Sequence, residues 1–180
     1  MSAANKMPKV EPQNPFDVKS DPDRHAIWER MIRVDGEAFV AADWSMVQDD
    51  FDAENFEGIR CGGSGNPDRW EIVFPTLNDY RDSWLEASKH FCAQPYANGI
   101  TPRDAIFMRM HLTRIEIHGD RCICRKKFYG HVPLRDGLAL DTTRQTVFRL
   151  HRRKDSPWGW LIVGFLGNLP LILGDDIVES

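Results

Sequence analysis

Residues 143–167 read TRQTVFRLHRRKDSPWGWLIVGFLG, and this stretch decides the fold. Its two halves, Thr143 to Arg153 and Trp158 to Gly167, are rich in the β-branched, aromatic and aliphatic residues that favour strands. Asp155-Ser156-Pro157 between them is typical of a turn. The stretch therefore predicts two long antiparallel strands of one sheet, joined by a short connection.

Two further strands are predicted before this pair. Ile106 to Ile117 and Arg121 to Val132 have the same character, and His118-Gly119-Asp120 forms the turn between them. Along the first of these strands the apolar residues change from even to odd positions. Because a shift by one residue turns side chains to the other face of a sheet, we expect a bulge near Thr113-Arg114 that bends the sheet.

The first half of the chain reads as helices and one hairpin. Apolar residues recur at helical spacing in residues 22–42, 44–51 and 77–91, and Asp21-Pro22 is typical of a helix start. Phe56 to Cys61 and Trp70 to Phe74 predict the two arms of a hairpin. This order predicts an α+β protein, in which three N-terminal helices pack against a bent, mostly antiparallel sheet of six strands.

Two short motifs invite a more specific interpretation. The loop Gly62-Gly63-Ser64-Gly65-Asn66-Pro67 lacks the lysine and the serine or threonine of a phosphate-binding loop, so a flexible hairpin tip is favoured. Cys122 and Cys124 are too close for the common zinc knuckle and no second pair follows, so buried thiols are favoured over metal or redox chemistry. We expect no metal and no cofactor.

Composition and charge exclude several classes of protein. Hydrophobic residues make up 42% and charged residues 28%, and no apolar run approaches the roughly 20 residues that cross a bilayer. Residues 103–154 hold 13 basic and 5 acidic residues, whereas the rest of the chain is acidic. Because the basic residues alternate with apolar ones along predicted strands, a solvated or subunit-facing sheet surface is favoured over nucleic-acid binding.

One domain accounts for most of the chain. Residues 1–20 are predicted to be a flexible arm, because Pro8, Pro12 and Pro15 prevent a helix there. Residues 21–170 form the predicted domain and residues 171–180 a tail. The start of the chain lacks the apolar core of a secretory signal and the cysteines suit a reducing compartment, so we expect a cytoplasmic protein.

The order of elements resembles that of the nuclear transport factor 2-like superfamily, particularly its SnoaL-like members. The resemblance is carried by Ala41-Ala42-Asp43-Trp44 at the end of the first helix, by Val47 and Phe51, and by Gly159 to Phe165 in the last strand. It covers roughly residues 23–170. It implies a cone, in which the helices lie in the concave face of a strongly bent sheet around an internal pocket, and a homodimer joined through the sheets.

The resemblance implies a class of ligand but no single reaction. SnoaL-like proteins bind small, largely apolar molecules of cyclic, aromatic, polyketide or steroid type, and some are isomerases, dehydratases or cyclases that use general acid–base catalysis without a cofactor. The alternative is a non-catalytic ligand-binding or structural subunit, such as the small subunit of a ring-hydroxylating dioxygenase. The ketosteroid-isomerase-like members carry a tyrosine on the first helix that donates to the oxyanion, and a carboxylate base on the first strand. This chain has Asp35 at the position of the tyrosine and Ile59 or Arg60 at the position of the base.

Asp35 is the first candidate catalytic residue. One apolar stripe of the first helix includes it, as Trp28, Met31, Asp35, Ala38 and Ala42. A carboxyl group buried in such a stripe suits general acid or base work. The apolar stripe can also be drawn one position further round the helix, which leaves Asp35 at its edge. That stripe consists of Ile27, Met31, Val34, Ala38 and Ala41. Both interpretations stay open.

Further candidates come from the helices and the strands. Tyr129 and His131 share one face of their predicted strand and are candidate catalytic residues with Asp35. Lys126 lies between Cys124 and Phe128 on the face of the predicted strand that points towards the core. It is therefore either a cation in the pocket or the sign of another bulge. The residues expected to bind the ligand are Trp28, Tyr80, Trp84, Met110 and Lys126.

Overall fold

The computed structural model describes residues 9–62, 64–169 and 177–179. The helices are α1 (Pro22–Trp28), α2 (Asp35–Ala41), α3 (Leu77–Cys92) and α4 (Pro102–Arg109). The strands are β1 (Glu57–Arg60), β2 (Glu71–Phe74), β3 (Met110–His118), β4 (Arg121–Phe128), β5 (Val132–Pro133), β6 (Leu138–Leu140), β7 (Arg144–Arg152), β8 (Trp160–Gly167) and β9 (Ile177–Glu179). The predicted α+β class is confirmed.

The main sheet has six strands in the order β2-β1-β8-β7-β4-β3. All neighbours are antiparallel except β1 and β8, which are parallel. The predicted hairpin and the predicted bulge are confirmed, because β1 pairs with β2 and the β3–β4 register shifts between Leu112 and Arg114. A second sheet has the order β5-β6-β9.

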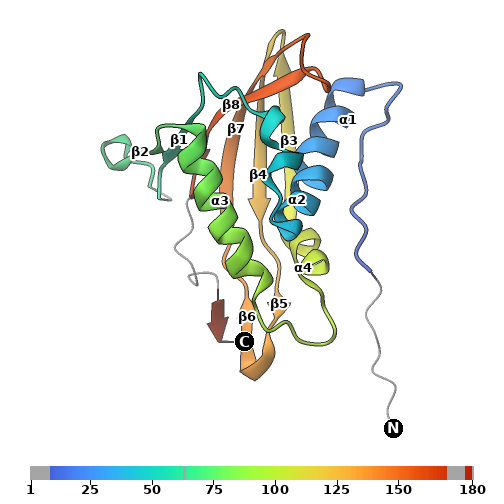
Figure 1. The fold of residues 1–180 in the computed structure, drawn as a ribbon, viewed down its shortest axis with the longest axis vertical. Helices are drawn as coiled ribbons and strands as arrows, with labels where there is room; N and C mark the ends of the chain where they lie inside the picture. The colour runs from blue at the N-terminus through green and yellow to red at the C-terminus, as the bar shows by residue number, and fades with distance from the viewer. Residues whose placement is uncertain (1–8, 63, 170–176, 180) are drawn as a thin grey trace.

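The helices cover one face of the main sheet. Figure 1 shows α1, α2 and α3 on the same side of the long strands β4 and β7. A π-helical segment, Glu29–Val34, joins α1 to α2, so the first predicted helix is one nearly continuous element. Asp21 caps its start through a hydrogen bond from the Arg24 backbone N–H, as predicted. Between helices and sheet lies the main core, in which Trp160 and Phe165 are fully buried.

One predicted strand begins later than expected. Residues 106–109 belong to α4, whose Thr101 and Asp104 form a capping box in which each side chain bonds to the other's backbone N–H. Pro102 occupies the first helical turn, where its missing N–H costs nothing. The alternation that suggests a strand therefore holds only from Met110 onward. The second predicted helix is likewise two short 3-10 turns, at residues 44–46 and 48–50.

The described segments near both ends of the chain pack more than the sequence suggests. Residues 9–20, predicted as a flexible arm, lie against α1 and α4: the Val10 N–H donates to Asp104, and the Asn14 amide donates to the His25 carbonyl and to Glu29. In the predicted tail, residues 177–179 form β9 and pair with β6. Residues 1–8, 171–176 and 180 of these two segments lie outside the described part of the chain.

Candidate functional site

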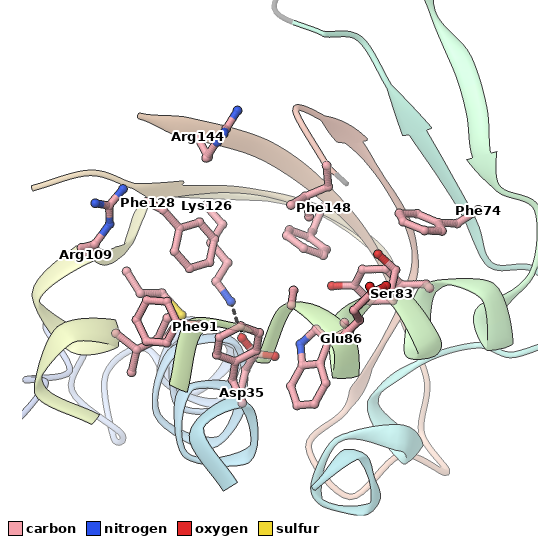
Figure 2. A pocket seen from close by; sticks show the side chains of 17 residues that line it. Asp35, Phe74, Ser83, Glu86, Phe91, Arg109, Lys126, Phe128, Arg144 and Phe148 are labelled. Carbon is pink, nitrogen blue, oxygen red and sulfur yellow. Dashed lines mark hydrogen bonds and ion pairs between the residues drawn. The ribbon is translucent and has the colours of Figure 1, made fainter. Parts of the chain in front are cut away.

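A cavity of about 130 Å³ lies between the helices and the sheet. Its apolar wall is mainly aromatic: Phe39, Phe74, Tyr80, Trp84, Phe91, Phe128 and Phe148. Its polar lining consists of Asp35, Ser83, Glu86, Arg109, Lys126 and Arg144. Figure 2 shows these side chains, which come from α2, α3, α4, β2, β4 and β7. A mostly apolar cavity with a few convergent polar groups is typical of a site for a small organic molecule.

The central polar feature of the cavity is an ion pair between Asp35 and Lys126. The Lys126 ammonium donates to Oδ2 of Asp35 at 2.6 Å, and the exposed fractions of the two side chains are 5% and 20% respectively. Lys126 also lies over the rings of Phe128 and Phe148, with its Nζ 5.5 and 5.9 Å from their centroids. The pair is therefore held in aromatic surroundings, where charge–charge interactions are stronger than in water.

Local structure explains how both charged residues reach the cavity. Asp35 is the first residue of α2, directly after the π-helical segment, and such segments frequently lie at functional sites. It lines the cavity, as the first of the two predicted stripes requires. Lys126 alternates along β4 with outward-facing residues, and its neighbours on the inward face are Cys124 and Phe128. Lys126 is thus a pocket cation.

Tyr80, Trp84 and Met110, predicted to contact the ligand, all line the cavity. Burial raises the pKa of Tyr80 above its ordinary value, and the nearby charge of Asp35 raises it further. The Tyr80 phenol therefore keeps its proton at physiological pH, so it can donate a hydrogen bond within the cavity.

A second buried carboxylate lies behind the first. Asp50 accepts hydrogen bonds from Nε and Nη2 of Arg30 at 2.9 and 2.8 Å, and a small neighbouring cavity is lined by Asp35, Asp50 and Lys126 together. Burial raises the pKa of Asp50 to about 6, against the opposing effect of Arg30. Sequence reasoning missed Asp50, because it stands between the exposed Asp49 and the partly buried Asp52 in an acidic run without apolar spacing.

Two arginines complete the polar lining, and neither was predicted. Arg109, the last residue of α4, donates through Nη2 to the Thr142 carbonyl at 2.6 Å. Arg144 begins β7 and pairs across the sheet with Phe128. Figure 2 shows both arginines beside Phe128, at one end of the group of side chains. The end of α4 and the register of β7 against β4 bring these residues together, and local sequence patterns do not reveal either.

Three predicted site residues lie elsewhere. Tyr129 is 42% exposed and stacks on His111, with ring centroids 4.1 Å apart. His131 is paired with the exposed Asp141 at 3.2 Å. The prediction placed both on one face of a strand that runs to Val132, but β4 ends at Phe128 and Gly130 has a φ of +117°, so neither residue belongs to that strand. Trp28 is buried in the core beneath Arg33 and is not among the residues that line the cavity.

The cysteines and the acidic residues of the described chain offer no metal site. Within residues 9–62, 64–169 and 177–179, no group of three His, Cys, Asp or Glu side chains is placed to hold a metal ion. Cys122 and Cys124 are buried, with their sulfurs 3.6 Å apart, as the prediction of core thiols requires. Across the same described residues, none of the helices has the length and apolar character to traverse a bilayer.

Comparisons with known proteins show similarity in structure alone. No protein family matches the sequence, and no curated protein matches it. A nuclear transport factor 2-like protein of unknown function from Shewanella baltica is 14% identical, with 84% of this chain and 96% of that chain covered and a TM-score of 0.49.

Two further solved structures have comparable similarity. A ketosteroid isomerase-like protein from Erwinia carotovora atroseptica is 14% identical, with 79% and 92% covered and a TM-score of 0.46. The CaMKII hub of S. rosetta is 16% identical, with 79% and 92% covered and a TM-score of 0.49.

The fold and the cavity together define the class: an α+β protein whose helices and bent sheet enclose a small pocket. The structural similarity is to nuclear transport factor 2-like proteins, as the sequence predicts. Since proteins of one fold perform unrelated functions, the function must be argued from the pocket itself.

Proposed function

We propose that the protein binds a small, largely apolar molecule in this cavity, and that Asp35 and Lys126 act on it as an acid–base pair. The observation that carries the proposal is a carboxylate and an ammonium in contact in the wall of an aromatic cavity. A buried ion pair is weak evidence for a stabilising role, because desolvation offsets much of its attraction. A few convergent polar groups in a mainly apolar cavity are in contrast typical of ligand-binding and active sites.

The size and the walls of the cavity support a small cyclic ligand. Its volume of about 130 Å³ is close to the roughly 150 Å³ of an apolar cavity known to bind benzene, so a single ring with a small substituent fits. Phe128, Phe148 and Trp84 offer ring faces and edges, which favour a cyclic or aromatic ligand over a flexible chain.

The pair can perform a cofactor-independent proton transfer. The Asp35 carboxylate accepts a proton from a carbon next to a carbonyl group, while the Lys126 ammonium donates a hydrogen bond to the oxygen on which negative charge develops. Return of the proton to another carbon completes an isomerisation. In a dehydration, Lys126 protonates the departing hydroxyl, and the Asp35 proton then passes to Lys126 across their hydrogen bond, which restores both groups.

Proton exchange at carbon tests this mechanism without knowledge of the natural substrate. In D₂O, we expect the protein to speed deuterium incorporation next to the carbonyl of 2-cyclohexen-1-one, measured by NMR. Asp35→Asn is expected to slow this exchange by about 100-fold or more, as the removal of a general base does. The matched control is Asp68→Asn, an exposed carboxylate in the turn between β1 and β2. Exchange as fast in Asp35→Asn as in the wild type would contradict the catalytic role.

A non-catalytic binding subunit is the second candidate. One observation favours it: Asp35 and Lys126 already satisfy each other, so the pair can serve to shape and polarise a binding pocket. This candidate predicts ligand binding in the cavity with no exchange above the buffer rate. The same experiment therefore separates the two functions.

The outer face of the sheet supports the expected homodimer. Ile123, Val147 and Leu161 alternate with buried residues on three adjacent strands, so their side chains lie on the face away from the helices. We propose that this face joins two copies of the chain, and light scattering after size exclusion measures the resulting mass. A single domain over residues 21–170 and a cytoplasmic location stay predictions.

A further inference from the structure

The guanidinium group of Arg144 has two buried nitrogens that form no hydrogen bond within the described residues. Arg144 lines the cavity, and its Nε and Nη2 atoms are buried without a hydrogen-bond partner in the described chain. A buried charged donor without an acceptor is costly, and folded proteins rarely keep one unless a ligand, an ion or water completes it. The edge of the guanidinium that carries Nε and Nη2 is therefore free to bind a ligand group.

Other arginines of the same molecule show what this edge holds. Nε and Nη2 of Arg30 donate to the two oxygens of Asp50, and Nε and Nη2 of Arg153 donate to the two oxygens of Asp155 at 3.1 and 3.0 Å. These two nitrogens present parallel N–H groups that match the two oxygens of a carboxylate. Within the described residues, Arg144 forms no such ion pair.

The surroundings of Arg144 suit an anionic group attached to a ring. Arg144 pairs with Phe128 across the sheet, and Phe128 pairs on its other side with Met110, the residue after Arg109. The Arg109 guanidinium is tied to the Thr142 carbonyl, two residues before Arg144, so a second positive charge lies at the same end of the cavity. Phe128 then separates this cationic end from the Asp35–Lys126 pair (Figure 2).

We infer that the ligand is a small ring-bearing carboxylic acid. Its carboxylate accepts hydrogen bonds from Nε and Nη2 of Arg144, and its ring lies against Phe128 and Phe148, towards Asp35 and Lys126. A carboxylate fits better than a phosphate, because a dianionic phosphate would bring a second charge into a mainly apolar cavity. This inference rests on the proposed function, since it names the class of ligand that the pocket takes.

Benzoate and benzamide are the probes, because they share size and shape and differ in charge. Binding is followed by NMR at the Met110 methyl group, which lines the cavity. We expect the wild type to bind benzoate at least about tenfold more tightly than benzamide, as charge-assisted hydrogen bonds are about twice as strong as neutral ones. Arg144→Gln should remove this preference and leave benzamide affinity unchanged, which also shows that the variant is folded.

Two further variants sharpen the test. Arg149→Gln is the matched control, since Arg149 belongs to the same strand but its side chain lies on the opposite face, paired with Glu57, so it should keep the preference for benzoate. Arg144→Lys keeps the charge without the parallel donors and should fall between the wild type and Arg144→Gln.

The outcomes separate this inference from the proposed function. Equal affinity for both probes, or an undiminished preference in Arg144→Gln, would overturn the carboxylate site while leaving the binding pocket in place. Failure of both probes to shift Met110 would overturn the carboxylate site and the proposed pocket function together.

Discussion

At the scale of single residues, the charged residues of the site differ in how far the sequence alone could reveal them. Asp35 and Lys126 could be named as candidates, because one helical stripe and the strand alternation turn them towards the core, but the sequence left a displaced stripe and a bulge open as alternatives. Tyr129 and His131 could not be excluded from sequence, since the end of β4 at Phe128 depends on the left-handed backbone at Gly130. Arg144 and Asp50 could not be found, because their roles come from partners distant in the chain.

Asp50 predicts a pH dependence of stability. Its pKa is about 6 in the folded protein and near 3.9 in an unfolded chain. The stabilising contribution of the protonated carboxyl is therefore complete below about pH 4 and is lost as the pH rises through 6. Between pH 4 and pH 7, we expect the free energy of unfolding of the wild type to fall by up to about 3 kcal/mol more than that of Asp50→Asn.

Urea unfolding at a series of pH values measures this difference. Asp68→Asn is the control, because Asp68 is an exposed carboxylate that is not among the charges acting on the pKa of Asp50, and it should keep the pH dependence of the wild type. Identical pH profiles for Asp50→Asn and the wild type would show that Asp50 does not titrate in this range.

At the scale of elements, contacts between helices and sheet set the position of the cavity wall. The order of helices and the hairpin followed from the sequence, because caps and periodicity are local signals. Helix α4 was misread as part of a strand, because Ile106 and Met108 happen to continue the alternation of Met110 and Leu112. The capping box at Thr101 was the signal that could have corrected this.

The contact between α2 and α4 requires a glycine at position 36. A Cβ atom there would lie 2.6 Å from Cε1 of Phe107 and 2.8 Å from the methyl carbon of Met110. We expect Gly36→Ala to lower the free energy of unfolding by about 1–3 kcal/mol, because overpacking outweighs the gain of up to about 1 kcal/mol in helix propensity.

Chemical denaturation of Gly36→Ala and of a control tests this contact. Gly65→Ala is the control, as a Cβ atom there meets nothing within 4 Å, and its stability should stay within about 0.5 kcal/mol of the wild type. A Gly36→Ala protein as stable as the wild type would mean that α2 and α4 can separate without cost.

At the scale of the whole molecule, the N-terminal segment joins parts of the fold that are distant in sequence. Residues 9–20 were predicted to be loose, because proline spacing excludes a helix and says nothing about docking of an extended chain. In the structure Val10 and Phe16 pack against the main core, and Arg103 of α4 binds both the Val10 carbonyl and Glu11. The arm is thus part of the domain surface.

Asn14 is the residue through which the arm can be tested. Its amide donates to the His25 carbonyl and to Glu29, and its oxygen accepts from the Phe16 N–H. We expect Asn14→Ala to lower the free energy of unfolding by about 1–3 kcal/mol, whereas Gln13→Ala, at an exposed position of the same arm, should have almost no effect. Thermal unfolding that does not distinguish the two variants would support a loose arm.

The central claim is that the cavity between the helices and the sheet takes up a small apolar molecule. NMR titration of the Met110 methyl group with toluene tests it most directly, in the wild type and in Ala87→Phe, where the added ring occupies the cavity. We expect a saturable shift of the Met110 methyl signal in the wild type and none in Ala87→Phe. A Met110 signal that toluene leaves unchanged in the folded wild-type protein would contradict it.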